Sequence, residues 1–212
     1  MKTERRLFVK ICGVRTPEEA RSAAEAGADA VGLVFWPGSP RRVDAPTARA
    51  IGEALPPSVL RVGVFVDADR EELARTAEDA GLDLLQLHGD EPPQAFAGLP
   101  RRAWKALRVG PDFAPSEADR YAGRAAGLLL DARVEGTPGG TGRAFDWSLA
   151  RGVRDRCPFL VLAGGLTPET VREAIHLVRP HGVDVSSGVE STPGRTDPGK
   201  VRAFVEAARS AL

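Results

Sequence analysis

The chain repeats one pattern from end to end, a short apolar run followed by an amphipathic segment. The runs start roughly 25 residues apart between positions 8 and 182, and such an interval holds a strand, a helix and two short loops. Apolar, partly β-branched runs of this kind are typical of buried parallel strands. The eight runs are FVKIC from Phe8, AVGLVF from Ala30, RVGVFVD from Arg61, DLLQLHG from Asp83, RAWKAL from Arg102, AGLLLDA from Ala126, PFLVLAGG from Pro158 and GVDVSSG from Gly182.

Eight such units in 212 residues predict an α/β fold, namely a single-domain (β/α)8 TIM barrel over residues 1–212. A doubly wound open sheet is the alternative. Helix starts fit the repeat, because Thr16, Pro17 and Glu19 offer an N-cap hydroxyl, a proline in the first turn and a capping-box glutamate. Thr167 and Pro168 repeat most of this signal before VREAIHLV. We therefore expect a helix after each of the two motifs.

Composition argues against several classes of protein. Basic and acidic residues balance at 29 each, and no block of like charge predicts binding to nucleic acid or to a membrane surface. No apolar stretch approaches the roughly 20 residues that span a bilayer, and the basic N-terminus lacks the apolar core of a signal peptide. Two cysteines predict no disulfide framework. We expect a cytoplasmic protein, for which a small anionic ligand remains possible.

Chemically versatile side chains follow the ends of the predicted strands. In a barrel of this type the active site lies at the C-terminal ends of the strands. Carboxylates, a thiol, an imidazole and a guanidinium at one rim suit proton transfer on an anionic substrate. The residues in these positions are Cys12, Arg41, Asp67, His88, Asp131 and Asp184.

The loops after the last two strands carry a candidate phosphate site. They read AGGL, with Gly164 and Gly165, and VSSGVE, with Ser186, Ser187 and Gly188. Glycines let backbone N–H groups approach an oxyanion, and the second loop can open a short helix toward it. The alternative is that both loops are plain tight turns. Because these loops are the usual phosphate site of such barrels, we expect them to bind phosphate.

Seven motifs in order resemble the phosphoribosylanthranilate isomerase family of tryptophan biosynthesis. They are KICG, GLVFWPGSPR, VGVFVD, LQLHGDE, GGTGRAFDW, LAGGLTPE and VDVSSGVE. The resemblance runs from Lys10 to the PGRTDP segment, and KICG, QLHG and VDVSSGVE are its most specific parts. Between Pro92 and Gly123 only the strand–helix rhythm is similar.

The resemblance implies a cofactor-free, metal-free Amadori rearrangement. The substrate would be N-(5-phosphoribosyl)anthranilate, a small-molecule phosphosugar, and the product 1-(2-carboxyphenylamino)-1-deoxyribulose 5-phosphate. Cys12 matches the family's general base, Asp131 its general acid, and Arg41 the arginine that holds the anthranilate end. The chain would act as a monomer or a homodimer, which the sequence does not decide.

The chemistry requires these residue types. Opening the ribose ring needs a proton on the ring oxygen, so Asp131 must be protonated when substrate binds. A C2 proton must then leave the Schiff base, and Cys12 accepts it only as a thiolate, which a neighbouring cation favours. Arg41 offers a planar fork that matches a carboxylate.

Other residues keep two interpretations. His88 contacts substrate or only satisfies buried hydrogen bonds, and Asp184 contacts substrate or only orders the site. We expect Asp67 to cap the following helix. Gly139 to Gly142 form either a plain loop or a cover over the site, because excluding water protects a Schiff base.

Four other functions compete with this one. An indole-glycerol-phosphate synthase needs catalytic lysines at strand ends, and Lys105 is the only lysine near one. A metal-dependent epimerase needs two histidines at the rim, but His176 falls within a predicted helix and His181 precedes the last strand. A histidine-pathway isomerase carries an aspartate at the end of the first strand, where this chain has Cys12. A non-catalytic phosphosugar-binding barrel would not need the pair of Cys12 and Asp131.

Strand parity yields one prediction that is independent of the family. Residues two apart on a strand share a face, so Lys10 points into the barrel if Cys12 does. A buried ammonium needs a carboxylate, and Asp184 on the last strand adjoins the first strand in a closed barrel. We expect a buried Lys10–Asp184 ion pair that favours the thiolate of Cys12.

Overall fold

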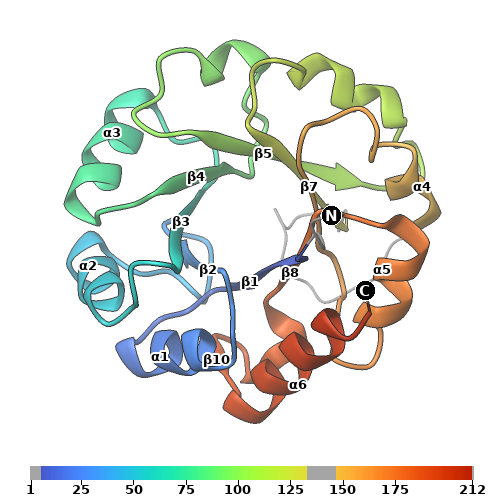
Figure 1. Cartoon of the computed structure of the whole chain (residues 1–212). Coiled ribbons are helices and arrows are strands. Elements are labelled where there is room, and N and C mark those ends of the chain that lie inside the picture. The colour runs from blue at the N-terminus through green and yellow to red at the C-terminus, as the bar shows by residue number, and fades with distance from the viewer. Residues whose placement is uncertain (1–5, 133–146, 212) are drawn as a thin grey trace, which may run out of the picture.

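Eight parallel strands close into a barrel in the computed structural model, which describes residues 6–132 and 147–211 (Figure 1). Each strand pairs with its neighbours in sequence, and β8 pairs with β1 from Phe8 opposite Gly182 to Ile11 opposite Val185. The predicted (β/α)8 barrel is confirmed, and the open-sheet alternative is wrong. The strands are β1 Phe8–Cys12, β2 Ala30–Val34, β3 Leu60–Phe65, β4 Leu84–Leu87, β5 Ala103–Val109, β6 Gly127–Ala132, β7 Leu160–Leu162 and β8 Gly182–Val185.

Helices form the outer layer around the barrel (Figure 1). They are α1 Pro17–Glu25, α2 Ala45–Glu53, α3 Arg70–Asp79, α4 Trp147–Arg151, α5 Val171–Val178 and α6 Pro198–Arg209. Thr16 caps α1 as predicted, because its side chain accepts a hydrogen bond from the Glu19 N–H. The Glu19 carboxylate accepts from the Arg15 N–H and not from that of Thr16. Helix α5 covers the predicted VREAIHLV segment, but its N-cap position is Thr170 and not Thr167.

Two connections depart from the predicted α-helices. After β4 and β5 the chain forms the 3-10 helices η1 (Pro93–Phe96) and η2 (Pro115–Tyr121). Prolines open both segments, but they also open α1 and α6, so a proline alone does not prevent an α-helix. Gly98 and Gly123 follow them with positive φ angles of 66° and 69°, a conformation that ends a helix. The segments are therefore too interrupted for an α-helix of several turns.

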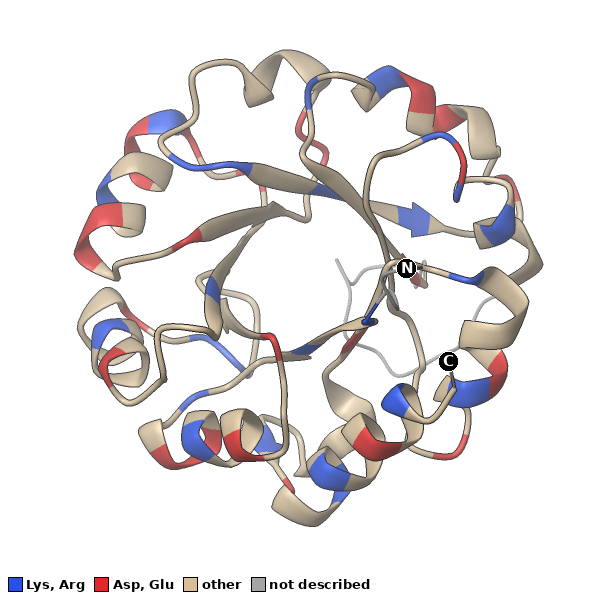
Figure 2. Ribbon diagram, viewed as in Figure 1, with Lys and Arg blue, Asp and Glu red and all other residues tan. Residues whose placement is uncertain are grey.

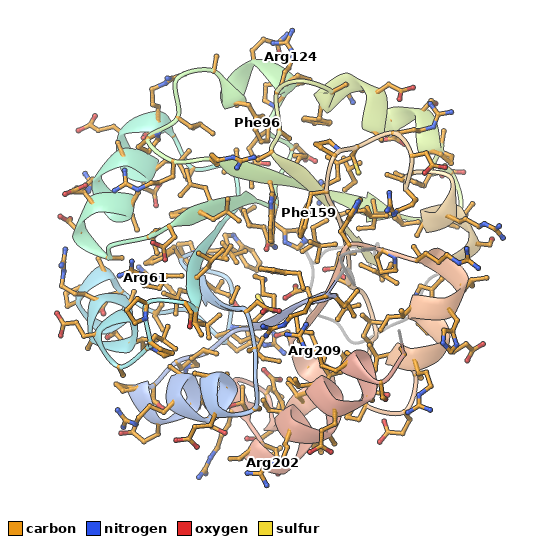
Figure 3. The ribbon with its side chains drawn as sticks, viewed as in Figure 1. Arg61, Phe96, Arg124, Phe159, Arg202 and Arg209 are labelled. Carbon is orange, nitrogen blue, oxygen red and sulfur yellow. The ribbon has the colours of Figure 1, made fainter. Side chains whose placement is uncertain are left out.

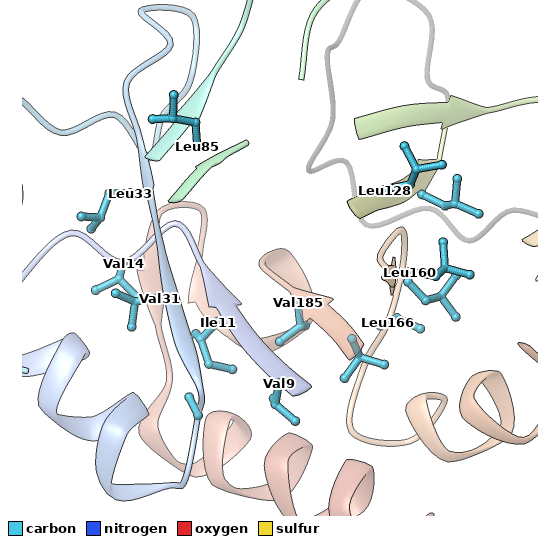
Figure 4. Close-up of a cluster of buried hydrophobic side chains, with 14 of the residues drawn as sticks. Val9, Ile11, Val14, Val31, Leu33, Leu85, Leu128, Leu160, Leu166 and Val185 are labelled. Carbon is cyan, nitrogen blue, oxygen red and sulfur yellow. The ribbon is translucent and has the colours of Figure 1, made fainter. Parts of the chain in front are cut away.

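The apolar core lies on both faces of the sheet. Val9 and Ile11 of β1 point outward and pack with the helices (Figure 4). A separate cluster inside the barrel includes Trp104, whose ring stacks on Phe159 with the centroids 5.6 Å apart. Phe159 lies near the middle of the barrel in Figure 3, at the end where the strands begin. Aromatic packing therefore fills the N-terminal end of the barrel, and the opposite end is left for a site.

Two short strands, β9 (Glu190–Thr192) and β10 (Arg195–Thr196), follow β8 and the 3-10 helix η3 (Ser187–Val189). They pair antiparallel outside the barrel.

Charges of both signs alternate over the outer helices (Figure 2), as the balanced composition predicts. Among the helices of the described segments, none combines the length and the apolar character that crossing a membrane requires.

Candidate active site

A cavity of about 630 Å³ lies at the C-terminal ends of the strands, a size typical of small-molecule sites. Every residue that the sequence marked as catalytic, substrate-binding or phosphate-binding lines it. These residues are Cys12, Arg41, His88, Asp131, Gly164, Gly165, Asp184, Ser186, Ser187 and Gly188. The closed barrel thus gathers residues from the whole length of the chain at one rim.

Cys12 is the last residue of β1, and its thiol faces the cavity. Because side chains alternate along a strand, Lys10 shares this inner face one layer deeper. Gly32 on the neighbouring β2 leaves room for both, since a Cβ there would lie 2.6 Å from the Cys12 Sγ and 3.0 Å from the Lys10 Nζ. The glycine of AVGLV therefore allows the thiol and the ammonium to lie side by side.

Lys10 and Asp184 form the predicted buried ion pair. The Lys10 Nζ lies 2.8 Å from Asp184 Oδ1, and the lysine side chain is fully buried. The two residues are directly opposite each other in the pairing of β1 with β8. Burial alone would lower the pKa of Lys10, but Asp184 and Cys12 together outweigh it and the pKa is raised. The ammonium therefore keeps its charge beneath the site.

Lys10 favours the thiolate of Cys12, as expected, but burial outweighs it in the protein by itself. Burial raises the pKa of the Cys12 thiol, Lys10 lowers it and Asp184 raises it, with a net value of about 11. Burial outweighs the ammonium because a thiolate loses more hydration in the barrel than one partly neutralised cation restores. Cys12 is therefore a thiol at neutral pH until a further positive charge arrives.

Asp131 lies near the end of β6 and is held on both sides. Its Oδ1 accepts a hydrogen bond of 2.8 Å from the Ala132 N–H, and its Oδ2 lies 3.4 Å from the His88 Nε2. His88 follows β4, where its own N–H donates to the carbonyl of Phe65 at 2.8 Å. The histidine therefore faces the candidate acid, and Gln86 beneath it contacts the other ring nitrogen at 2.9 Å.

Arg41 reaches across the end of β1 to a partner that the sequence reading missed. Its Nε and Nη2 donate to the two carboxylate oxygens of Glu190 at 2.6 and 2.8 Å. Gly13 makes this path possible, because a Cβ there would lie 2.6 Å from the Arg41 Cδ. The guanidinium that was expected to bind a ligand thus uses its Nε–Nη2 edge for Glu190. Its Nη1 side is left to bind an anion. Glu190 is the last residue of the VDVSSGVE motif. An acidic residue in so specific a motif was the signal that could have indicated a role at the site.

The two glycine-containing loops pack against each other at the rim. Gly164 and Gly165 have positive φ angles of 80° and 71°, a conformation that favours glycine. The second loop forms η3, as the expected short helix. A Cβ at Gly188 would lie 2.0 Å from the carbonyl oxygen of Leu166. Among the described residues, the buried Ser186 Oγ has no hydrogen-bond partner.

Asp67 does not cap the helix that follows it. Asp69 caps α3 by accepting from the Glu72 N–H. Asp67 has a φ of 51° and instead accepts from the Asp90 N–H at 2.6 Å. Because its side chain hydrogen-bonds across the loops, Asp67 ties the loop after β3 to the loop that follows His88.

Lys105 and Glu91 brace the same loop. The Lys105 Nζ lies 2.7 Å from the Glu91 carboxylate and 2.7 Å from the carbonyl of Gly89. Glu91 also accepts from the N–H groups of Gly89 and Asp67. Lys105 is not among the residues that line the cavity, so it does not supply the lysine of a synthase.

The remaining expectations concern metal ligands, His176 and the glycine-rich segment. No group of three histidine, cysteine, aspartate or glutamate side chains within residues 6–132 and 147–211 is placed to hold a metal ion. His176 lies within α5, as predicted. The Gly139 to Gly142 segment lies outside the described residues.

Comparison with known proteins gives one consistent result. A family model described as N-(5'phosphoribosyl)anthranilate (PRA) isomerase matches residues 9–207. The N-(5'-phosphoribosyl)anthranilate isomerase of Pseudomonas aeruginosa (strain LESB58) is 54% identical over 203 residues, which are 95% of each chain.

Two solved structures are similar over nearly their whole length. One is a phosphoribosyl anthranilate isomerase in complex with reduced 1-(o-carboxyphenylamino)-1-deoxyribulose 5-phosphate, with a TM-score of 0.86 and 41% identity, covering 96% of this chain and 99% of that one. The other shows monomers of the dimeric enzyme of Thermotoga maritima, with the same TM-score, identity and coverage.

Proposed function

The chain belongs to the N-(5'-phosphoribosyl)anthranilate isomerase family of tryptophan biosynthesis, and from that premise we propose a mechanism in which Cys12 and Asp131 carry the proton transfers. The observation that supports it is their placement in one cavity. Strands β1 and β6 are three positions apart around the barrel. The thiol and the carboxyl therefore approach a bound substrate from different walls.

Asp131 acts first, as the general acid. It gives its proton to the ring oxygen of the ribose, the C1–O bond breaks, and the anilino nitrogen becomes part of a cationic Schiff base. The Ala132 N–H and the His88 ring lie beside the carboxylate that remains. Hydrogen bonds to a carboxylate stabilise its charged form. These two groups therefore stabilise Asp131 after it has given up its proton.

Cys12 acts second, as the general base. The iminium supplies the positive charge that the free protein lacks, and together with Lys10 it favours loss of the thiol proton to solvent, which leaves the thiolate. The thiolate takes the C2 proton, and the electron pair of the broken C–H bond forms the enolamine. Tautomerisation of the enolamine then gives the ketone product. Because the pKa of the free thiol is about 11 and a general base works best with a pKa near the operating pH, the added charge of the iminium is what makes Cys12 an effective base.

The two anionic ends of the substrate have separate sites. We assign the anthranilate carboxylate to Arg41 on the side that Glu190 leaves open. The phosphate belongs to the backbone N–H groups of Gly164, Gly165 and the turn of Ser186 to Gly188. A related enzyme bound to a reduced carboxyphenylamino-deoxyribulose phosphate supports a ligand with these two ends.

The test of the activity is a fluorescence assay for the loss of phosphoribosylanthranilate generated in situ. We expect wild-type protein to consume the substrate without added metal or cofactor. A protein that binds the product but leaves the substrate unchanged would be the non-catalytic phosphosugar-binding barrel, and the proposed function would be wrong.

The test of the phosphate site compares two rim variants. Gly165→Val introduces a branched side chain at a position with positive φ and should abolish detectable product binding by blocking approach to the backbone. Ser187→Ala removes only one hydroxyl, and we expect the dissociation constant to rise by no more than about tenfold. Equal affinities of wild-type and Gly165→Val protein would exclude this phosphate site.

A further inference from the structure

Gln86 is a buried polar residue that the mechanism above does not use. It lies on β4 two positions before His88, so both side chains face the cavity. Its amide Nε2 is 2.9 Å from the His88 Nδ1, and the His88 Nε2 is 3.4 Å from Asp131 Oδ2. The three side chains therefore form a row that ends at the candidate general acid.

The row has a direction because the group of Gln86 that contacts His88, the amide NH₂, can only donate. The Gln86 NH₂ group carries two hydrogens and no lone pair for a neighbour, so the His88 Nδ1 accepts. A neutral imidazole then carries its hydrogen on Nε2. Asp131 is compatible with this assignment, since a carboxyl oxygen can accept from an N–H whether or not the group holds its proton. If the Gln86 amide were turned around, its Oε1 would accept a hydrogen bond from the His88 Nδ1–H. The His88 Nε2 would then present a lone pair to Asp131.

The contact between His88 and Asp131 does not meet hydrogen-bond geometry in the free protein. Within the described part of the chain, the buried His88 Nε2 has no hydrogen-bond partner. Catalytic hydrogen bonds are often long before substrate binds and tighten in the complex. The tautomer of His88 decides whether that tightening brings an N–H or a lone pair to the acid.

We propose that Gln86 is a positioning residue, which holds His88 in the Nε2–H tautomer and so prevents the imidazole from taking the reactive proton of Asp131. The proposal rests on the proposed role of Asp131 as the general acid. In this tautomer both ring nitrogens are occupied, one by its own hydrogen and one by the Gln86 amide. The imidazole therefore has no site for the carboxyl proton, which goes to the ring oxygen of the substrate. After the transfer, the His88 N–H stabilises the carboxylate.

Nitrogen NMR of the histidine rings in the ligand-free protein tests this directly. The chain has three histidines, and a His88→Gln variant identifies the signals of His88 by their loss. His181 serves as the internal reference, because its Nδ1 accepts a hydrogen bond of 2.8 Å from the Leu160 N–H. We expect His88 to match it, with a pyridine-like Nδ1 and a pyrrole-like Nε2. A pyrrole-like Nδ1 at neutral pH would overturn the proposal.

Two variants then separate positioning from packing. Gln86→Glu replaces a donor by an acceptor, so it should turn the His88 Nδ1 pyrrole-like and lower kcat by at least about tenfold, with a smaller change in KM. The loss should stay below the ~10⁴-fold that a wrong tautomer costs where the histidine itself moves the proton. Gln86→Met keeps the length without the donor and should give mixed tautomers and an intermediate kcat.

The outcomes distinguish this proposal from the proposed function. Gln86→Glu protein with the wild-type ring signals and the wild-type kcat would overturn the positioning role. If that variant fails to fold, the spectrum of the wild-type protein still decides the tautomer. Wild-type protein that shows the Nε2–H tautomer but does not consume phosphoribosylanthranilate would contradict the proposed function and leave the tautomer assignment intact.

Discussion

Two buried lysines on two strands of the barrel form similar ion pairs on opposite faces of the sheet. Lys10 meets Asp184 at 2.8 Å, and Lys105 meets Glu91 at 2.7 Å, with both lysine side chains almost fully buried. Lys10 shares the inner face of its strand with Cys12. Lys105 points outward, because its neighbours Trp104 and Ala106 belong to the interior cluster.

The difference teaches that strand parity, more than residue type, decides what a buried charge does. The inner pair, Lys10 with Asp184, adjoins the cavity and shifts the pKa of a reactive thiol. The outer pair, Lys105 with Glu91, closes the loop that follows His88 and is surrounded by backbone groups. The inner pair should therefore affect chemistry, and the outer pair should affect mainly stability.

The largest expected effects come from removing each lysine. Lys10→Met and Lys105→Met each leave a buried carboxylate unpaired, which should cost about 3–5 kcal/mol of unfolding free energy. Only Lys10→Met should also lower kcat, by about 10- to 100-fold, the size typical of a group that supports a reactive residue. Urea unfolding and the fluorescence assay on the folded fraction measure the two quantities. An equal loss of kcat in both variants would break the distinction between the pairs.

Neutral double replacements sharpen the comparison with smaller changes in stability. Lys105→Met with Glu91→Gln removes both charges and keeps an oxygen for the Asp67 and Gly89 N–H groups. We expect it to recover most of the lost stability, because no charge stays unpaired, and to keep near-normal kcat. Lys10→Met with Asp184→Asn should recover stability but not kcat. Full recovery of kcat by the inner double variant would show that the inner charges have no role in the chemistry.

The smallest expected effect concerns the titration of Cys12. Only a thiolate is alkylated, so in a Cys157→Ala background the rate of iodoacetamide labelling should rise with pH toward a midpoint near the pKa of about 11. Lys10 lowers that pKa and Asp184 raises it, so Lys10→Met should move the midpoint to higher pH. A midpoint that falls in the Lys10→Met variant would contradict the assigned sign.

The same pKa makes a prediction about stability. The folded thiol holds its proton to higher pH than an unfolded thiol, whose pKa is about 8.5. The contribution of Cys12 to the unfolding free energy is therefore present below that value and is lost as pH rises toward about 11. Cys12→Ala protein should lose less stability than wild type over this range in urea titrations at each pH. An identical pH dependence would contradict the raised pKa.

The sequence was most informative where a pattern repeats or a strand imposes its parity. The interval between apolar runs predicted all eight strands, and parity with closure of the barrel predicted the contact of Lys10 with Asp184. Both follow from backbone geometry, and the spacing of residues in a single sequence is enough to apply it. The ten rim residues follow from the same rule, since parallel strands end at one edge.

The remainder depended on interactions that no local pattern encodes. Arg41 and Glu190 are 149 residues apart, and their contact depends on the path that Gly13 leaves open. The pKa of Cys12 results from burial competing with nearby charges of both signs. The direction of the net shift depends on the relative sizes of these effects. Glycines with positive φ stop the helical rhythm after η1 and η2, because that conformation ends a helix whatever the apolar spacing.

The most direct test of the central claim is the turnover of the acid and base variants. If Asp131 and Cys12 carry the two proton transfers, Asp131→Asn and Cys12→Ala should each lower kcat by about 10²- to 10⁴-fold, the usual contribution of a positioned acid or base. The dissociation constant of the product should change far less, because neither variant alters the assigned carboxylate or phosphate sites. Near-normal turnover of Asp131→Asn would contradict the account.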